Sequence, residues 1–303
     1  MNCSLLATLW FCALSMTALS ARADKGVWSR PLDVSATIDG KLARAKMLVR
    51  TPVGYERDHG SRRYPLVLAL HGWGHSAAQF KKDGELGRMA DESGVVIAVP
   101  DMGKSVYETQ FYPETRGAWA SVPGTRWIGE VVLPFMRANY AVFPERAQTS
   151  IVGYSTGGRG ALLVAESYPE FGFAGSLSGT FDLFALEPNT GEYRIHANVY
   201  GDRKRFGTRW SKDDGVSKEL VPKLLHVEVF LAHGAEDKTV LFAQSETMAR
   251  VLIAAGGAVT HATVKGAGHD WAFWNTLWAP MFAAMTRGFA AASSVAMPNK
   301  NAH

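Results

Sequence analysis

The sequence predicts an α/β fold: a mostly parallel, doubly wound sheet with an antiparallel N-terminal edge. Short apolar runs, typical of strands buried on both faces, alternate with helix-like stretches along most of the chain. Near the N-terminus, Val34–Ile38 and Lys41–Arg50 instead alternate apolar and polar residues on either side of Asp39-Gly40, which is the pattern of a β-hairpin. The hairpin therefore predicts the antiparallel edge, and the strands after it predict the parallel part.

The remaining regular elements follow in chain order. Buried strands are expected at Tyr64–Leu70, Val95–Pro100, Thr149–Tyr154, Phe173–Ser178, His226–Ala232 and Ala258–Lys265. Helices are expected at Glu85–Ser93, Trp127–Asn139, Gly160–Tyr168, Val240–Ala255 and from about Asp270 onward. Trp271, Trp274 and Trp278 recur at helical spacing in this last helix, which indicates a stripe that packs against the core.

Two long segments interrupt the alternation of strands and helices. Residues 101–126 and 179–221 are rich in aromatic side chains, so we expect irregular insertions that form the walls of a substrate cleft. The second segment also carries Arg203–Arg205 and Arg209. This basic cluster belongs either to a solvated loop or to a site for an anionic or sugar-rich substrate.

The first residues resemble an export signal. Leu5–Leu19 is an almost unbroken apolar run that is too short to span a bilayer, and Ala21-Arg22-Ala23 matches the small-x-small pattern of a cleavage site. We therefore expect a signal peptide at 1–23, a mature chain that begins near Asp24, and export to the periplasm or the medium. Because no Lys or Arg precedes the apolar run, an uncleaved anchor is the alternative.

Composition limits what the mature chain can be. The only two cysteines, Cys3 and Cys12, lie in the export segment, so we expect no disulfide and no thiolate metal site after cleavage. Hydrophobic residues make up 47% of the chain, which suits one α/β domain at 24–292 followed by a disordered tail at 293–303. The formal charge of +4 is spread along the chain, so we expect no nucleic-acid partner, and no stable membrane insertion once the signal is removed.

One short motif points to chemistry. Gly153-Tyr154-Ser155-Thr156-Gly157-Gly158 joins the strand at Thr149–Tyr154 to a helix, which is the context of a G-x-S-x-G nucleophile elbow. Such a tight turn leaves no room for a Cβ at Gly153 or Gly157, and Gly158 lets the helix approach the sheet. The motif predicts that Ser155 is a nucleophile presented at the edge of the sheet.

A nucleophilic serine needs a base, and the base needs an acid that fixes its tautomer. Of the nine histidines, His269 follows a strand and a Gly-Ala-Gly loop, at the sheet edge where open α/β sheets bind their ligands. Asp237 follows the strand before it, with Glu236 and Asp182 as competing acids. We prefer Asp237, because the order Ser155, Asp237, His269 is the chain order of α/β-hydrolase triads.

The motifs around these residues resemble one known family. Leu70-His71-Gly72-Trp73-Gly74, the Ser155 elbow, His233-Gly234-Ala235-Glu236-Asp237 and Gly268-His269-Asp270-Trp271 follow one another as in the putative-esterase family of α/β-hydrolases. This family includes esterase D, feruloyl esterases and the antigen 85 mycolyltransferases, and the similarity extends from about Pro52 to Gly288. Thr156 departs from it, because Met is common at that position.

The resemblance implies an α/β-hydrolase fold, a covalent acyl-enzyme and no cofactor. In this family the glycine-rich loop at His71–Gly74 would turn a backbone N–H toward the reacting carbonyl, so Trp73 and Thr156 are the expected oxyanion-hole donors. His71 and His75 are four residues apart, but two glycines separate them and no carboxylate pattern accompanies them. We expect no metal there.

These observations predict an exported serine esterase that acts on a small-molecule or polymer-linked ester; the oligomeric state is left open. One alternative is an acyltransferase of the same fold that passes the acyl group to a sugar or lipid alcohol. A second alternative, from a different class, is a non-catalytic binding protein on a hydrolase scaffold. The complete set of serine, histidine and acid favours an enzyme over this last alternative.

Overall fold

The structure is a computed structural model, and it describes residues 25–112 and 122–295. The predicted signal peptide, residues 296–303 of the predicted tail and Trp119 of the first insertion lie outside these ranges. Within the described part of the chain, no helix is both long and apolar enough to cross a membrane. The last helix, α10 (Trp271–Val295), extends a few residues into the stretch expected to be a tail.

The described strands form one nine-stranded sheet in the order β1-β3-β5-β4-β6-β7-β8-β9, with β2 paired to β3. The N-terminal strands pair antiparallel, at β1 (Val27–Trp28), β2 (Leu32–Ile38) and β3 (Lys41–Thr51). The others are parallel, at β4 (Leu66–Leu70), β5 (Val96–Pro100), β6 (Thr149–Tyr154), β7 (Phe173–Leu177), β8 (Glu228–Gly234) and β9 (Val259–Val264). The predicted hairpin and parallel sheet are both confirmed.

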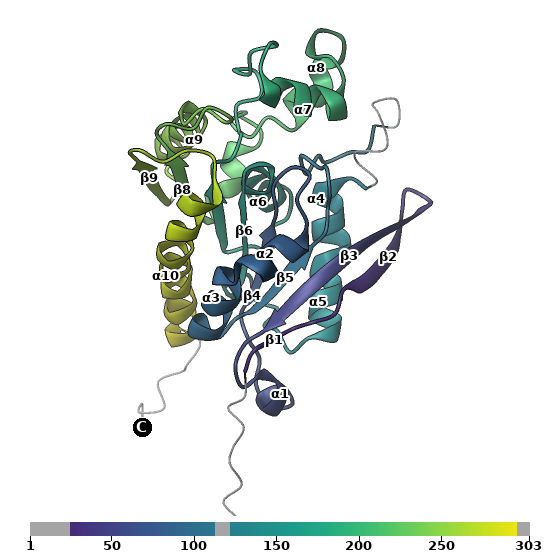
Figure 1. Cartoon of the computed structure of the whole chain (residues 1–303), viewed down its shortest axis with the longest axis vertical. Helices are drawn as coiled ribbons and strands as arrows, with labels where there is room; N and C mark the ends of the chain where they lie inside the picture. Colours follow the sequence, from purple (N-terminus) through teal and green to yellow (C-terminus); the bar gives the residue numbers. More distant parts are fainter. Residues whose placement is uncertain (1–24, 113–121, 296–303) are drawn as a thin grey trace, which may run out of the picture.

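Helices cover both faces of this sheet, as a doubly wound fold requires (Figure 1). Strand β4 shows this most clearly, because its alternate side chains enter two different hydrophobic clusters. Leu66, Leu68 and Leu70 pack in the cluster of α5 (Leu133–Asn139) and α6 (Thr156–Ser167). Val67 and Ala69 pack in the cluster of α2 (Ala77–Asp83), α3 (Glu85–Ser93) and α10.

The order of the strands fixes where a ligand can bind. The chain passes from β4 to β5 on one side and then returns to β6 on the other side of β4. The carboxyl ends of β4 and β6 are therefore a topological switch point, the place where open α/β sheets bind ligands. Both the His71–Gly74 loop and Ser155 follow these two strand ends.

The structure differs from the sequence prediction at several helices. Helix α6 begins at Thr156 rather than Gly160, directly after the predicted nucleophile. The helix expected at Trp127–Asn139 begins earlier, as α4 (Gly124–Arg126), continues as the π-helix η1 (Trp127–Val132) and ends as α5. Before residue 179, helices α1 (Tyr55–Asp58) and α2 were not predicted; further along the chain, α9 (Ala243–Ala254) lies within its predicted range.

The prediction that residues 179–221 are irregular was wrong. This segment contains α7 (Gly191–Tyr200) and α8 (Arg203–Lys212), and η3 (Val221–Leu224) begins at its end. Thr190 caps α7 by accepting a hydrogen bond from the Tyr193 N–H, and Asp202 caps α8 in the same way. The two helices lie together at one end of the molecule, beyond the sheet (Figure 1).

Candidate active site

The turn between β6 and α6 holds Ser155 in a strained conformation, with φ 54° and ψ −129°. Its glycines fit as the sequence predicted. A Cβ on Gly153 would lie 2.3 Å from the Gly157 carbonyl oxygen, and one on Gly157 would lie 2.2 Å from the Leu70 carbonyl oxygen. A Cβ on Gly158 would lie 2.5 Å from a side-chain oxygen of β7. Only glycine permits this close approach of strand, turn and helix.

Three residues predicted from separate parts of the sequence meet at this turn. His269 Nε2 lies 2.9 Å from Ser155 Oγ, and His269 Nδ1 lies 2.6 Å from Asp237 Oδ2. A carboxylate can only accept, so Nδ1–H donates to Asp237 and leaves Nε2 to accept from the serine hydroxyl. This tautomer is the one that a base beside a serine needs.

Asp237 is buried and held from several sides. Its Oδ1 accepts hydrogen bonds from the backbone N–H groups of Thr239 and Val240, at 2.8 and 2.9 Å. His233 Nε2 lies 3.3 Å from Oδ2. Burial raises the pKa of Asp237, but the hydrogen bonds from His233 and His269 outweigh it and hold this pKa well below its usual range. The carboxylate therefore stays ionised beside His269.

The competing acids do not take this place. Glu236 is exposed, and Asp182 Oδ1 instead accepts hydrogen bonds from the N–H groups of Phe184 and Ala185. The ring of His233 lies beside Asp237, a contact that the sequence did not predict. Its Nε2 donates to the Val240 carbonyl at 2.8 Å, and its Nδ1 accepts from Ser245 Oγ at 2.7 Å.

The His71–Gly74 loop runs directly beside the serine turn. A Cβ on Gly72 would lie 3.1 Å from the Ser155 Cβ, so the loop backbone lies against the nucleophile candidate. His71 is buried and braces the loop, because Nδ1 donates to the Gly72 carbonyl at 2.8 Å and Nε2 accepts from the Met102 N–H at 2.9 Å. His71 therefore fixes the path of the loop beside Ser155.

His75 contacts the residue that precedes Ser155. Its Nδ1 lies 2.7 Å from the Tyr154 hydroxyl, and burial lowers the pKa of its imidazole. Across the described residues, no group of three or more His, Cys, Asp or Glu side chains is placed to hold a metal ion.

Aromatic side chains of α10 support the base. Trp274 and Trp278 are buried in the core, as the helical stripe predicted. Trp274 also contacts the His269 ring edge-to-face, with 5.0 Å between the ring centroids. Its Nε1–H donates a hydrogen bond to Ser178 Oγ at 3.1 Å. This contact with the base was not predicted, since helical spacing alone does not show which residue a stripe faces.

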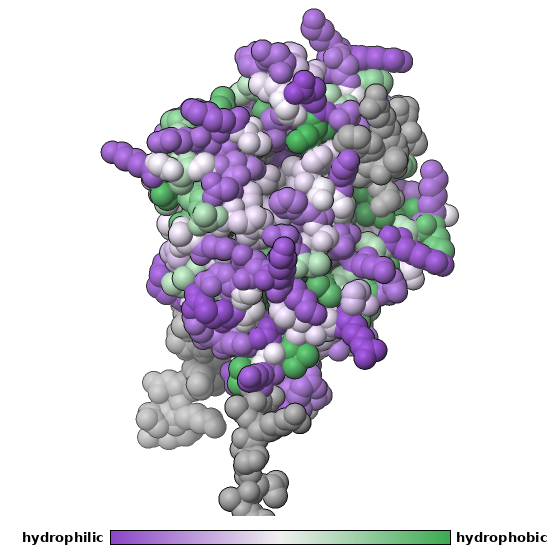
Figure 2. Space-filling model, in the orientation of Figure 1, coloured by the Kyte–Doolittle hydropathy of each residue, from purple (hydrophilic) through white to green (hydrophobic). Residues whose placement is uncertain are grey.

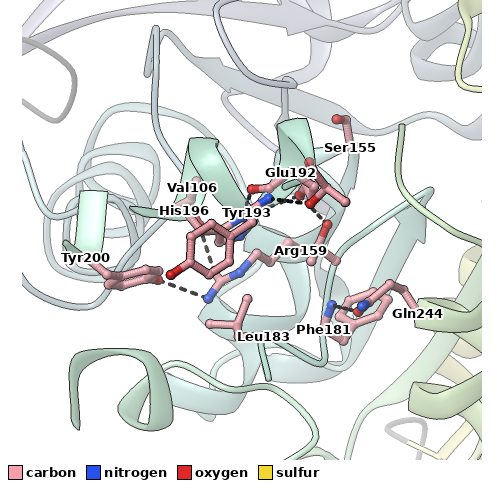
Figure 3. A network of polar contacts seen from close by, with 12 residues as sticks. Val106, Ser155, Arg159, Phe181, Leu183, Glu192, Tyr193, His196, Tyr200 and Gln244 are labelled. Carbon is pink, nitrogen blue, oxygen red and sulfur yellow. Dashed lines mark hydrogen bonds and ion pairs between the residues drawn. The ribbon is translucent and has the colours of Figure 1, made fainter. Parts of the chain in front are cut away.

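Buried polar contacts attach α7 and α8 to the helix that follows Ser155. Arg159 of α6 is 2% exposed, and its guanidinium donates to the carbonyls of Val106 and Asp213 and to the Tyr200 hydroxyl (Figure 3). Arg203 lies over the rings of Tyr193 and two other aromatic residues and donates to backbone carbonyls. At least this arginine of the basic cluster therefore contributes to packing within the segment.

Comparisons with known proteins agree with this architecture. The sequence model of the family described as "Putative esterase" matches residues 42–287. An S-formylglutathione hydrolase from Agrobacterium tumefaciens is 18% identical with a TM-score of 0.69, and the match covers 88% of this chain and 96% of that chain. A fluorophosphonate-binding serine hydrolase from Staphylococcus aureus is 18% identical with a TM-score of 0.65, covering 86% and 99%.

A ferulic acid esterase from the anaerobic fungus Anaeromyces mucronatus is 18% identical with a TM-score of 0.61, covering 87% of this chain and 92% of that chain. The structural similarities show the fold, and the family match extends over most of the described sheet and reaches the elbow and both loops beyond β8 and β9. The chain belongs to the putative-esterase family of carboxylic ester hydrolases and has the α/β-hydrolase fold predicted from its sequence.

Proposed function

We propose that the protein is a serine esterase that forms a covalent acyl-enzyme on Ser155. Ser155 Oγ attacks the ester carbonyl while His269 Nε2 takes its proton, and the tetrahedral intermediate collapses as His269 returns that proton to the leaving alcohol. Water then attacks the acyl-enzyme by the same route and releases the acid. The observation that carries this proposal is the continuous path from Ser155 Oγ through His269 to Asp237, with contacts of 2.9 and 2.6 Å.

We infer that backbone N–H groups of Trp73 and Thr156 form the oxyanion hole. Thr156 is the first residue of α6, so its N–H is among those that a helix leaves without an intrahelical partner. The loop that carries Trp73 lies against Ser155 through Gly72. Each such donor is worth about 3 kcal/mol in the transition state.

The test is hydrolysis of p-nitrophenyl acetate, butyrate and hexanoate by the wild type and Ser155→Ala. The wild type is expected to turn over at least one of these esters, and the variant is expected to lose about 10⁴-fold or more in kcat. Folded wild type that hydrolyses none of them, or a Ser155→Ala variant that keeps full activity, would refute the serine mechanism.

We also propose that the mature protein is exported, on the basis of the Leu5–Leu19 apolar run and the Ala21-Arg22-Ala23 cleavage pattern. N-terminal sequencing of the protein recovered from cells that express the full chain tests this. A mature N-terminus near Asp24 is expected, and an intact N-terminus on a cytoplasmic product would overturn the export proposal.

A further inference from the structure

A cavity of about 420 Å³ lies between α7 and the segment that follows Asp237. Its volume falls within the range of small-molecule sites, about 300–1,000 Å³. Much of its wall is apolar, from Leu186, Ile195, Val240 and Leu241. Leu186 and Ile195 belong to the 179–221 segment that the sequence predicted to wall a substrate cleft, whereas Val240 and Leu241 were not predicted to line a site.

One buried carboxyl group belongs to this wall. Glu192 lines the cavity and is only 5% exposed. Its Oε1 accepts a hydrogen bond from Thr180 Oγ1 at 2.5 Å. Its other oxygen, Oε2, accepts no hydrogen bond from any residue that the structure describes and is not fully buried. Because Glu192 lines the cavity, Oε2 can accept a hydrogen bond from a ligand that supplies a donor there.

The cavity adjoins the proposed triad. Thr239 and Val240 line the cavity, and their backbone N–H groups bind the carboxylate of Asp237. Burial raises the pKa of Glu192, and the hydrogen bond from Thr180 opposes this rise. The cavity therefore lies on the side of the site where His269 and Asp237 stand.

The position of the cavity distinguishes the two parts of an ester, namely the acyl arm and the alcohol arm. His269 must return its proton to the leaving oxygen, so the alcohol arm of the substrate has to pass beside His269. The His71–Gly74 loop lies against Ser155 and, in our proposal, faces the carbonyl oxygen. Of the two arms, the alcohol arm is the one that this geometry directs toward the cavity.

We propose that the cavity binds the alcohol arm of the ester and that Glu192 Oε2 accepts a hydrogen bond from a hydroxyl group carried by that arm. The apolar walls suit an uncharged arm, and Lys238 lines the same cavity and disfavours a cationic one. This inference rests on the proposed esterase function and adds its substrate class, namely esters of alcohols that carry a second hydroxyl group.

The test compares hexyl acetate with 6-hydroxyhexyl acetate. Wild type is expected to prefer the hydroxylated ester by at least about tenfold in kcat/KM, which corresponds to about 1.4 kcal/mol. Glu192→Met keeps a similar length but removes the acceptor, so it is expected to abolish the preference. Glu219→Met, at an exposed position outside the cavity, is the matched control and is expected to keep it.

Several results would overturn the inference. One is equal turnover of the two esters by wild type. Another is a hydroxyl preference that survives in Glu192→Met. The third is a preference that appears instead between methyl 6-hydroxyhexanoate and methyl hexanoate, which would place the hydroxyl recognition on the acyl arm. A stronger preference for 6-ammoniohexyl acetate than for the hydroxylated ester would replace the hydroxyl with a cation and likewise contradict the proposal.

A second variant makes the test independent of how Glu192→Met folds. Leu241 is 62% exposed and lines the cavity, so Leu241→Trp fills the cavity without disturbing the core. This variant is expected to lower kcat/KM for both hexyl esters relative to methyl acetate, and an unchanged ratio would overturn the cavity assignment.

Fluorophosphonate labelling of every protein separates the two proposals. Unlabelled wild type defeats the esterase function itself, whereas labelled proteins without hydroxyl preference defeat only this inference.

Discussion

Ser155 adopts backbone angles that few non-glycine residues tolerate, and its neighbours hold it there. The sequence predicted Ser155, Asp237 and His269 because each follows a strand in a recognisable motif. It did not predict the support that His233 gives to Asp237 or the contact of Trp274 with His269. Both contacts depend on which way a buried ring faces in the folded chain, and local sequence patterns do not contain that information.

Asp237→Asn tests the role assigned to the acid. An asparagine can present its NH₂ group to His269 Nδ1, which favours the tautomer with the proton on Nε2 and leaves no acceptor for the serine hydroxyl. We expect kcat to fall about 10⁴-fold with little change in the circular dichroism spectrum. Glu236→Gln, at the exposed neighbouring position, is the control and should keep near wild-type kcat. If both variants lose the same activity, Asp237 is not the acid.

At the scale of elements, the strands were predictable and the helices of residues 179–221 were not. Buried parallel strands are continuous apolar runs, so β4 to β8 were found within a few residues of their ends. Helix α8 is instead polar over most of its length and has non-helical angles at Phe206. Arg203 stabilises this helix by packing over the rings of Tyr193 and Trp210. Arg159 of α6, which is distant in the sequence, also donates a hydrogen bond to the carbonyl at the end of α8.

The close packing around Gly157 in the elbow can be tested by substitution. A Cβ at Gly157 would lie 2.2 Å from the Leu70 carbonyl oxygen, so Gly157→Ala must move β6, α6 or the loop after β4. We expect activity to fall at least 100-fold, since displacements of about 1 Å at a reacting group have effects of this size, and the melting temperature should also fall.

Gly207→Ala in α8 is the matched control, because a Cβ there meets no atom within 4 Å. Alanine in a helix interior is more favourable than glycine by about 1 kcal/mol, so this variant is expected to keep its activity and its stability. Gly157→Ala with wild-type kinetics would show that the turn does not need the close approach described above.

For the molecule as a whole, the core contains several ionisable groups beneath the α7 and α8 helices. Glu108 is fully buried, and burial raises its pKa to about 7. Arg159 lies in the same region and bonds to three residues of the surrounding segments. The visible surface, by contrast, is mostly hydrophilic with small scattered apolar patches (Figure 2). Because burial raises the pKa of Glu108 in the folded protein, the free energy of unfolding depends on pH.

Glu108→Gln isolates this effect. The folded-state pKa of about 7 lies above the unfolded value near 4.5, so the folded wild type loses stability as pH rises through this window. Glutamine does not ionise. From pH 5 to pH 8, the free energy of unfolding of the variant should therefore rise by up to about 3 kcal/mol relative to that of wild type. Urea unfolding at both pH values measures this difference. Glu219→Gln, at an exposed position, should show none, and an equal pH dependence in all three proteins would contradict the assignment.

Intact-mass analysis after treatment with a fluorophosphonate tests whether a single serine in this molecule is activated as a nucleophile. Wild type is expected to gain one adduct on Ser155, and Ser155→Ala is expected to gain none under the same conditions. Folded wild type that takes no adduct, or an equal adduct on the Ser155→Ala variant, would contradict the proposed nucleophile.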